Sequence, residues 1–373
     1  MPLKVLNYLA LIFICIVTVD AQELHYSNYH FTPLNVNPAN AGAFSGSYRV
    51  SGIYSDKHAS ITPRPFRTFT LSADAPIVRG IRKQDWIGIG IEMDVVGKSG
   101  INFDAMDVSQ EPGAAAKSTQ SWTFMKIGAA YHFSLDKKQT NIITLGAQFI
   151  NGSRDFNTLN QRDGRVGLQT SFRDLDIIHF NKGTAGGTGG GTNTGRVDFS
   201  SYKDLSVGFL YKVKQKESEL RLGFAMEGLL NPAVGFNSRG ANKDSLESKY
   251  FGLNIHGSYE LMLNKKTQLV PGFYYYSLGP ANALNINTQA WYKIDPEKDF
   301  RAGAGLGLRN LRAAIIYLGA EFKDLRVGLA YDIDISSATI GSRSVGGFEL
   351  SASYLGKIYK KPKPKPIIMC PRL

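Results

Sequence analysis

The chain has 373 residues, 43% of them hydrophobic, and its mean hydropathy is −0.17, which excludes a protein built from membrane-spanning helices. The formal net charge of +12 suggests an anionic partner. The positive side chains are scattered through turns and the C-terminal tail, and the chain carries an export signal. We therefore expect no nucleic acid partner, and favour an anionic outer surface or an acidic protein.

Residues 1–21 predict a secretory signal peptide. Lys4 supplies a positive start, residues 9–17 are an unbroken apolar run, and Ala21 ends a small-residue cleavage site. The apolar run is shorter than the roughly 20 residues that a spanning helix needs. Cys15 lies within the signal and has no small neighbours, so we expect no lipoprotein. Cleavage leaves Cys370 as the single cysteine, and no disulfide can form within one chain.

A two-residue alternation of apolar and polar side chains recurs along most of the remaining chain. In residues 325–334, for example, Leu325, Val327 and Leu329 alternate with charged or small residues. Successive side chains of a strand point to opposite faces, so such segments present one apolar and one polar face. Repeated behind an export signal, this pattern predicts a transmembrane antiparallel β-barrel of an outer membrane, spanning residues 47–357. The expected strands number about fourteen: 48–55, 67–75, 86–96, 122–134, 141–152, 202–213, 220–229, 249–262, 268–277, 283–294, 299–308, 312–322, 325–334 and 346–356.

The connections between these strands sort by length. Several short charged turns follow even-numbered strands, whereas the long loops near 97–121, 153–201 and 230–248 follow odd-numbered ones. Outer-membrane barrels have short periplasmic turns and long extracellular loops. We therefore predict that both ends of the barrel domain lie on the periplasmic side.

The predicted strands place charged residues on the face opposite the apolar one. We expect these side chains to line the lumen, as a network of salt bridges or, alternatively, as a substrate pathway. The residues are Glu92, Asp94, Lys126, Arg221, Glu227, Glu260, Arg301, Asp332, Asp334 and Glu349.

Recognisable catalytic and cofactor motifs are missing from the sequence. The six histidines show no metal-ligand spacing, and there is no nucleophile elbow. The glycine-rich run at 183–192 lacks the ending of a phosphate-binding loop, so it reads as a mobile outer loop. The glycines of residues 303–307 lie within a strand and predict a small-residue stripe in the lumen. We expect no enzymatic activity, no metal and no cofactor.

Residues 358–373 form a basic tail in which lysine and proline alternate. Proline cannot donate ladder hydrogen bonds and favours extended polyproline geometry. The tail is therefore predicted to be either a stiff periplasmic spacer with an apolar tip or a disordered extension.

Residues 22–46 contain an aromatic and proline-rich motif: Tyr29, Phe31, Pro33, Leu34, Asn37, Pro38, Ala39, Ala41 and Gly42. With the Cys-Pro pair near the C-terminus, it resembles the PorP/SprF family of type IX secretion outer-membrane proteins from Bacteroidetes-type bacteria. We expect this segment at the periplasmic mouth or inside the lumen. Pro33 and Pro38 prevent regular ladder pairing, and Gly42 permits a tight bend.

The resemblance implies a barrel that supports export or surface anchoring of a client adhesin through the client's C-terminal domain. Expected partners are that domain, other type IX secretion and gliding components, and lipid or lipopolysaccharide. A solute-uptake channel of the fatty-acid-transporter kind is the alternative. The hypothesised partner-binding residues are Tyr29, Phe31, Pro33, Asn37, Pro38, Gly42, Lys361, Lys363, Cys370, Pro371 and Arg372.

Overall fold

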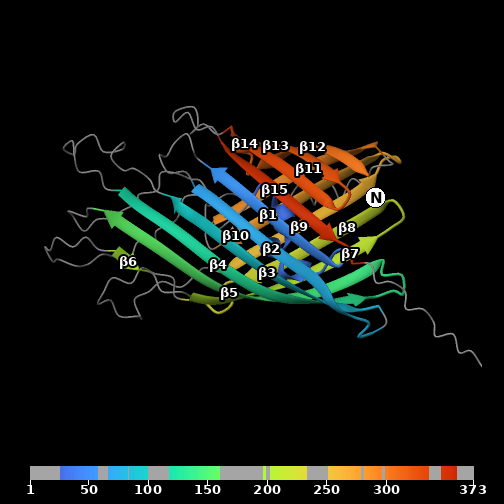
Figure 1. Ribbon diagram of the computed structural model, residues 1–373, viewed down its shortest axis with the longest axis horizontal. Helices are drawn as coiled ribbons and strands as arrows, with labels where there is room; N and C mark the ends of the chain where they lie inside the picture. The colour runs from blue at the N-terminus through green and yellow to red at the C-terminus, as the bar shows by residue number, and fades with distance from the viewer. Residues whose placement is uncertain are drawn as a thin grey trace, which may run out of the picture.

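The computed structural model describes residues 26–57, 66–82, 84–99, 117–159, 196–198, 202–232, 251–278, 281–295, 299–335 and 346–358. They form a closed antiparallel barrel of 14 strands (Figure 1). The strands are β1 (Tyr48–Lys57), β2 (Phe66–Arg79), β3 (Trp86–Ser99), β4 (Lys117–Ser134), β5 (Asn141–Leu159), β7 (Tyr202–Lys214), β8 (Ser218–Glu227), β9 (Gly252–Met262), β10 (Thr267–Leu278), β11 (Ala281–Asp295), β12 (Phe300–Arg309), β13 (Ala313–Phe322), β14 (Leu325–Asp334) and β15 (Gly347–Gly356).

The barrel is of the up-and-down type, in which each barrel strand pairs with the next along the chain. The ring closes where the first strand, β1, pairs with the last, β15, over the register Tyr48↔Gly356 to Lys57↔Gly347. A further short strand, β6 (Arg196–Asp198), pairs only with the far end of β5. The fold class predicted from the alternation is therefore confirmed.

Two of the expected loops begin or end as strand. β4 starts at Lys117 and β5 continues to Leu159, and the two stay paired along this extension. The segment 117–121 is polar at every position, so it carries no alternation from which a strand could be predicted. The expected loops 97–121 and 153–201 are correspondingly too long.

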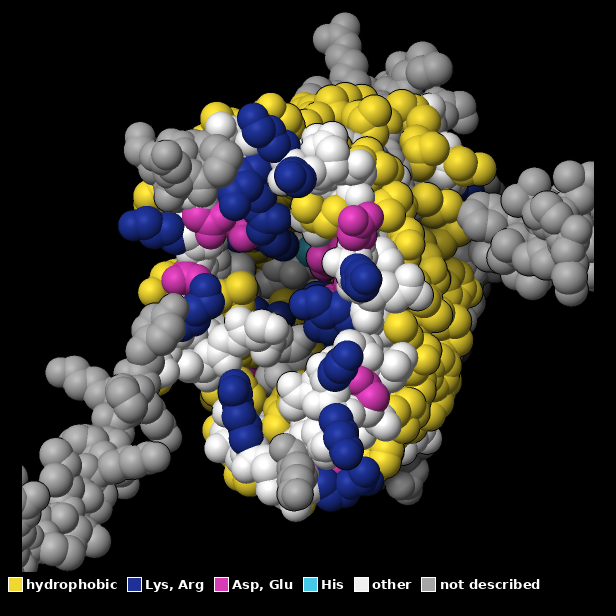
Figure 2. Space-filling view, turned by 90° about the vertical axis from the view of Figure 1, so that its right-hand side faces the viewer, with side chains coloured by type: hydrophobic (Ala, Val, Ile, Leu, Met, Phe, Trp, Pro, Cys, Tyr) yellow, Lys and Arg dark blue, Asp and Glu magenta, His cyan; other side chains and the backbone are white. Residues whose placement is uncertain are grey.

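The two faces of the barrel wall differ as predicted. On β14, Leu325, Val327 and Leu329 are 38–43% exposed on the outside, whereas Ala330 and Asp332 are buried in the lumen. Figure 2, a view onto one end of the barrel, shows hydrophobic side chains covering the outer wall along its right-hand side. Apolar surface of this extent indicates a non-aqueous surrounding. No helix in the described ranges is long and apolar enough to cross a membrane.

The two ends of the barrel are unlike. The tight connections at 135–140, 215–217, 263–266 and 323–324 lie at the end where β1 begins and β15 finishes, which we call the short-turn end. The strands β1, β3 and β5 finish at the opposite end, the long-loop end (Figure 1).

We call residues 26–46 the N-terminal segment: residues 26–42 lie inside the barrel, and residues 43–46 lie at its short-turn end. The segment contains η1 (Tyr29–Phe31), α2 (Pro33–Val36) and η2 (Pro38–Asn40). Pro33 and Pro38 each begin a helical turn, where the missing N–H of proline costs nothing. The bend before β1 uses Gly42 at a φ of +70°.

Candidate functional site: the N-terminal segment in the lumen

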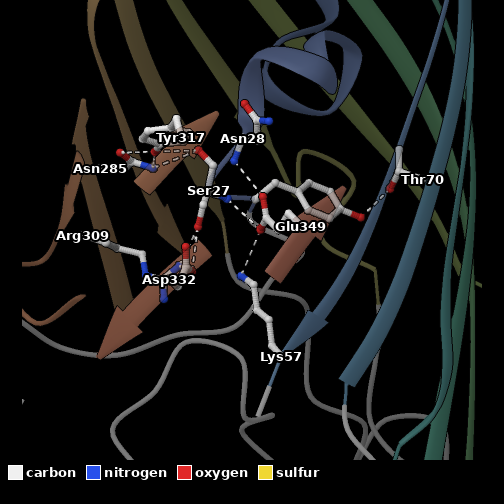
Figure 3. A network of polar contacts seen from close by, with 10 residues as sticks. Ser27, Asn28, Lys57, Thr70, Asn285, Arg309, Tyr317, Asp332 and Glu349 are labelled. Atoms are coloured by element: carbon white, nitrogen blue, oxygen red, sulfur yellow. Dashed lines mark hydrogen bonds and ion pairs between the residues drawn. The ribbon is translucent and has the colours of Figure 1, made fainter. Parts of the chain in front are cut away.

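The first described residues of the N-terminal segment are held near the long-loop end by a lumen carboxylate. Glu349 on β15 accepts the backbone N–H of Ser27 at 2.9 Å and that of Asn28 at 2.8 Å (Figure 3). Lys57 Nζ lies 3.7 Å from the same carboxylate. Glu349 is 1% exposed, so both of its oxygens are used in a site closed to bulk water.

The other side of Ser27 is bound as tightly. Its carbonyl accepts the Tyr317 hydroxyl at 3.0 Å and Asn285 Nδ2 at 3.3 Å. Its hydroxyl donates to Asp332 at 2.8 Å, and Asp332 is paired with Arg309 at 2.7 Å. These partners come from β11, β12, β13 and β14, so one serine ties together four neighbouring strands (Figure 3).

A second charged cluster lies beside Tyr26. The Tyr26 hydroxyl is 2.6 Å from Thr70 Oγ1, which donates to Asp94 at 2.5 Å. Lys126 Nζ lies 2.8 Å from Asp94 and 2.9 Å from Glu92. Both carboxylates are fully buried. A buried charge is tolerated when it is paired in this way, so the cluster favours the salt-bridge interpretation of the lumen charges.

The remaining predicted lumen charges follow the same pattern. Arg221 pairs with Glu219 and lies 3.5 Å from Glu260, and Arg301 pairs with Glu321. Glu227 accepts a hydrogen bond from Asn254. The Asp334 side chain falls outside the part of the structure that is described.

The middle of the segment packs through aromatic side chains. Tyr29 stacks on Tyr274 with ring centroids 5.0 Å apart, and its hydroxyl accepts Asn287 Nδ2 at 3.1 Å. Burial raises the pKa of Tyr29, so this hydroxyl stays protonated. Burial also lowers the pKa of His30 to about 4, and the nearby Arg326 and Arg221 act in the same direction.

Asn37 joins the segment to three strands. Its Oδ1 accepts the Ala39 N–H at 2.9 Å and so caps η2. Its Nδ2 lies 2.9 Å from the Phe209 carbonyl, 3.3 Å from the Phe224 carbonyl and 3.1 Å from His256 Nε2. Asn37 is completely buried, so these contacts together replace the hydrogen bonds that its side chain would make to water.

The segment leaves the lumen at the short-turn end through contacts with Ala41 and Gly42. His132 Nε2 donates to the Ala41 carbonyl at 2.7 Å, and Trp86 Nε1 donates to the Gly42 carbonyl at 3.0 Å. The Gly42 N–H donates to Asp74 at 2.7 Å. The segment therefore runs through the whole lumen, from Glu349 near one end to Trp86 at the other.

Three wall glycines make room for this path. A Cβ atom on Gly208 would lie 2.0 Å from Asn37 Oδ1, one on Gly88 would lie 2.0 Å from the Ala41 carbonyl oxygen, and one on Gly146 would lie 2.5 Å from Ala39 N. Contacts this short are impossible, so only glycine lets the backbones of wall and segment approach.

The sequence-predicted site residues divide into two groups. Tyr29, Phe31, Pro33, Asn37, Pro38 and Gly42 are brought together inside the lumen, where all are buried against the wall. Their partner-binding role stays a prediction. Lys361, Lys363, Cys370, Pro371 and Arg372 lie outside the described residues, as do the predicted signal peptide and the glycine-rich run at 183–192.

Several residues that hold the segment were missed from the sequence, chiefly His132, Trp86 and Asp74. Their position on the inner face of a strand is the only signal that could have identified them. Among the described residues, no three His, Cys, Asp or Glu side chains gather as a metal site.

Comparisons with solved structures identify barrels of the same fold. The toluene transporter TbuX of Ralstonia pickettii is 11% identical, with 92% of this chain and 96% of that chain covered at a TM-score of 0.51. The toluene transporter TodX of P. putida is 12% identical, with 92% and 97% covered, also at 0.51. At these identities the likeness shows the fold alone. No curated protein matches the sequence.

A family comparison covers most of the chain. The sequence model of the family described as type IX secretion system membrane protein PorP/SprF matches residues 18–354 of this chain. This range includes the N-terminal segment and nearly all of the barrel. The expected location, as a multi-pass barrel in the outer membrane, agrees with the family and with the fold shared with the toluene transporters. The chain therefore belongs to the PorP/SprF family of type IX secretion system membrane proteins.

Proposed function

We propose that this outer-membrane barrel binds a client adhesin and supports its export or its anchoring at the cell surface. The client would be recognised through its C-terminal domain at the long-loop end. The barrel would act without catalysis and without a cofactor. Lipid and lipopolysaccharide would cover the apolar outer wall, and the exposed Leu, Ile and Phe side chains there support this part of the proposal.

The observation that carries this proposal is the N-terminal segment inside the lumen. Its polar contacts reach β1, β2, β3, β4, β7, β8, β9 and the strands of the Ser27 network, and its Asn37, Ala39 and Ala41 are fully buried. A lumen occupied in this way favours a protein that acts through its two ends rather than by conducting a solute. Membership of the PorP/SprF family supports the part of the proposal that places the barrel in type IX secretion.

The two ends would then have different partners. The sequence places its longest connections at the long-loop end, where a dedicated client would be gripped. The short-turn end carries both ends of the barrel domain, and the sequence continues from there, after Ile358, into the basic tail. Under the orientation predicted from loop length, this end faces other type IX components and the gliding machinery in the periplasm.

The proposal is tested in a strain that displays its secreted proteins. Removing residues 360–373 should abolish display of one large secreted protein, while the barrel itself stays heat-modifiable in electrophoresis and other type IX cargo is still exported. The same large protein should co-purify with the tagged full-length barrel through its C-terminal domain. Unchanged display after the deletion would remove the tail from the proposal, and no retained client would overturn the client role.

A solute-uptake channel is the second candidate, because the fold is shared with two transporters of toluene. Purified barrel in liposomes should then admit small apolar solutes at rates that exceed those of empty liposomes. The secretion role predicts no such increase while the N-terminal segment is in place.

A further inference from the structure

The short-turn end contains a cavity of about 670 Å³ that the N-terminal segment does not fill. Residues 43–46 of the segment and Ser47 form one side of it. The connection between β2 and β3, the facing parts of β4, β5 and β7, and the end of β15 form the others. Figure 2 shows this end as a hollow ringed by dark-blue Lys and Arg side chains.

The lining is strongly basic. It includes Arg79, Lys138, Lys212, Lys214 and Lys357, and one carboxylate, Asp85. That carboxylate is engaged inside the wall, because it accepts the Tyr131 hydroxyl at 2.8 Å and the Ser134 N–H at 3.1 Å. It also lies 3.6 Å from Arg82. The cavity therefore presents a net positive field to whatever enters it.

The cations of the lining differ in how far they are already paired. Lys212 lies 3.0 Å from Glu219, and Lys357 donates to Asp324 at 2.6 Å. Lys138 and Lys214 are exposed and make no ion pair within the described residues. These two side chains are available to an anion without breaking an existing salt bridge.

The inner wall of the cavity is partly apolar. Trp86 stacks on His132 with centroids 4.5 Å apart and planes 11° apart. Ile142 and Leu210 line the cavity beside them. A ligand that matches this surface combines negative charge near the rim with apolar groups deeper in, which is a property of polypeptide rather than of a small anion.

We propose that this cavity binds an acidic segment of another protein, one that meets the barrel at its short-turn end. The chain's own tail does not match the site, because residues 359–373 contain five Lys or Arg residues and no Asp or Glu. A lipid headgroup matches it poorly, because the cavity lies inside the ring of strands and not on the apolar outer wall. This inference is separate from client binding, which is proposed for the opposite end, and it rests on the proposed assignment of a protein partner to the short-turn end.

The test uses the full-length barrel in nanodiscs and a fluorescent oligoglutamate peptide. Saturable binding that weakens as salt rises is expected for the acidic peptide, and none for an oligoglutamine peptide of equal length. The double substitution Lys138→Glu/Lys214→Glu should lower the affinity about tenfold or more, since each reversal replaces an attraction by a repulsion.

The matched control is Lys265→Glu/Lys266→Glu. These lysines are exposed in the β9–β10 turn at the same end, and they do not line the cavity. The control changes the net charge equally and should alter the affinity no more than about twofold. Equal losses in both double variants would overturn the proposal, because they would show that total charge alone attracts the peptide.

Two further measurements test whether the effect is graded with charge and whether lipid is the true ligand. Lys138→Gln/Lys214→Gln, a milder change, should give an intermediate affinity, and heat-modifiability verifies that every variant is folded. Vesicles of phosphatidylglycerol and of phosphatidylcholine are compared as competitors of the peptide. A barrel that binds the phosphatidylglycerol vesicles but never the peptide would assign the cavity to lipid and overturn the proposal.

Discussion

Asn37 Nδ2 lies 3.1 Å from His256 Nε2, so the N-terminal segment is tied to β9 from a position 219 residues away in the chain. The same amide group also contacts the carbonyls of Phe209 and Phe224. One asparagine thus satisfies polar groups of three wall strands, and the segment is docked by specific contacts rather than by filling space alone.

Asn37→Ala should weaken this docking. The change removes the acceptor of the buried Ala39 N–H and the side-chain partner of His256 Nε2, which costs about 1–3 kcal/mol. Hydrogen exchange of residues 26–46 should become faster in the folded barrel. Asn35→Ala is the matched control, because Asn35 Nδ2 has no hydrogen-bond partner among the described residues. Equal effects of both substitutions would contradict the role assigned to Asn37.

Gly208→Ala should displace the segment from β7. The added Cβ would lie 2.0 Å from Asn37 Oδ1, and because Asn37 is held by several contacts it cannot simply move aside. Protease cleavage within residues 26–46 should increase. Gly52→Ala should leave cleavage unchanged, because a Cβ there meets its nearest heavy atom, the Thr70 carbonyl oxygen, at an ordinary 3.4 Å. Unchanged protease cleavage in Gly208→Ala would contradict this prediction, because it would show that the barrel wall shifts to admit the added methyl group while the segment stays in place.

Glu349→Gln should release the first residues of the segment. The carboxylate accepts the backbone N–H groups of Ser27 and Asn28, one on each oxygen. A glutamine side chain has only one acceptor oxygen, so one of these two N–H groups would face the amide NH2, which is itself a donor. The loss is about 1.5–3 kcal/mol for a hydrogen bond to a charged group. Amide exchange at Ser27 and Asn28 should accelerate. Glu260→Gln, made near the short-turn end, should leave these two amides protected.

The sequence predicted the barrel well because the wall lies between two different surroundings. On strands such as β14 the apolar side faces outward and the small or polar side faces the lumen, so a single residue such as Leu329 already fixes the face of its neighbours. On β10 the contrast is weaker, because Tyr274 and Tyr276 are buried in the lumen. Where that contrast is missing, as at Lys117 in the extension of β4, the strand was not predicted. Lumen charges such as Glu92 and Asp332 were placed correctly for the same reason.

The course of the N-terminal segment could not be predicted in the same way. Its helical turns are too short to give a period, and its contacts join residues that are distant in the sequence, such as Asn37 and His256, which lie 219 positions apart. Gly208 is recognisable from the sequence as a small lumen residue, but not as the partner of Asn37. Pro33 and Pro38 excluded a strand, Gly42 indicated a bend, and the segment was expected at the periplasmic mouth or inside the lumen, but none of these residues indicated which wall strands it would contact.

Acidification should loosen the segment through His30. The pKa of His30 is lowered from 6.5 to about 4 by burial, so the docked form binds its proton less readily than the undocked form. Docking is therefore fully stabilised above about pH 6.5 and weakens as the pH falls toward 4. Hydrogen exchange of residues 26–46 should rise over this window. His30→Gln should flatten the rise, and an identical pH profile in that variant would assign the effect to other groups.

Leu329→Arg should destabilise the barrel from its outer face. Leu329 lies at the middle of β14 and is 38% exposed on the apolar wall, where an arginine costs about 2–4 kcal/mol in a bilayer. Leu311→Arg is the matched change outside the belt, since Leu311 is 77% exposed in the connection between β12 and β13, and its expected cost is about 0–1 kcal/mol. Urea unfolding from lipid vesicles measures both. Because the lumen is unaffected, amide exchange of the N-terminal segment in the folded fraction should match the unmodified protein, and faster exchange there would mean that the wall and the segment are not separable.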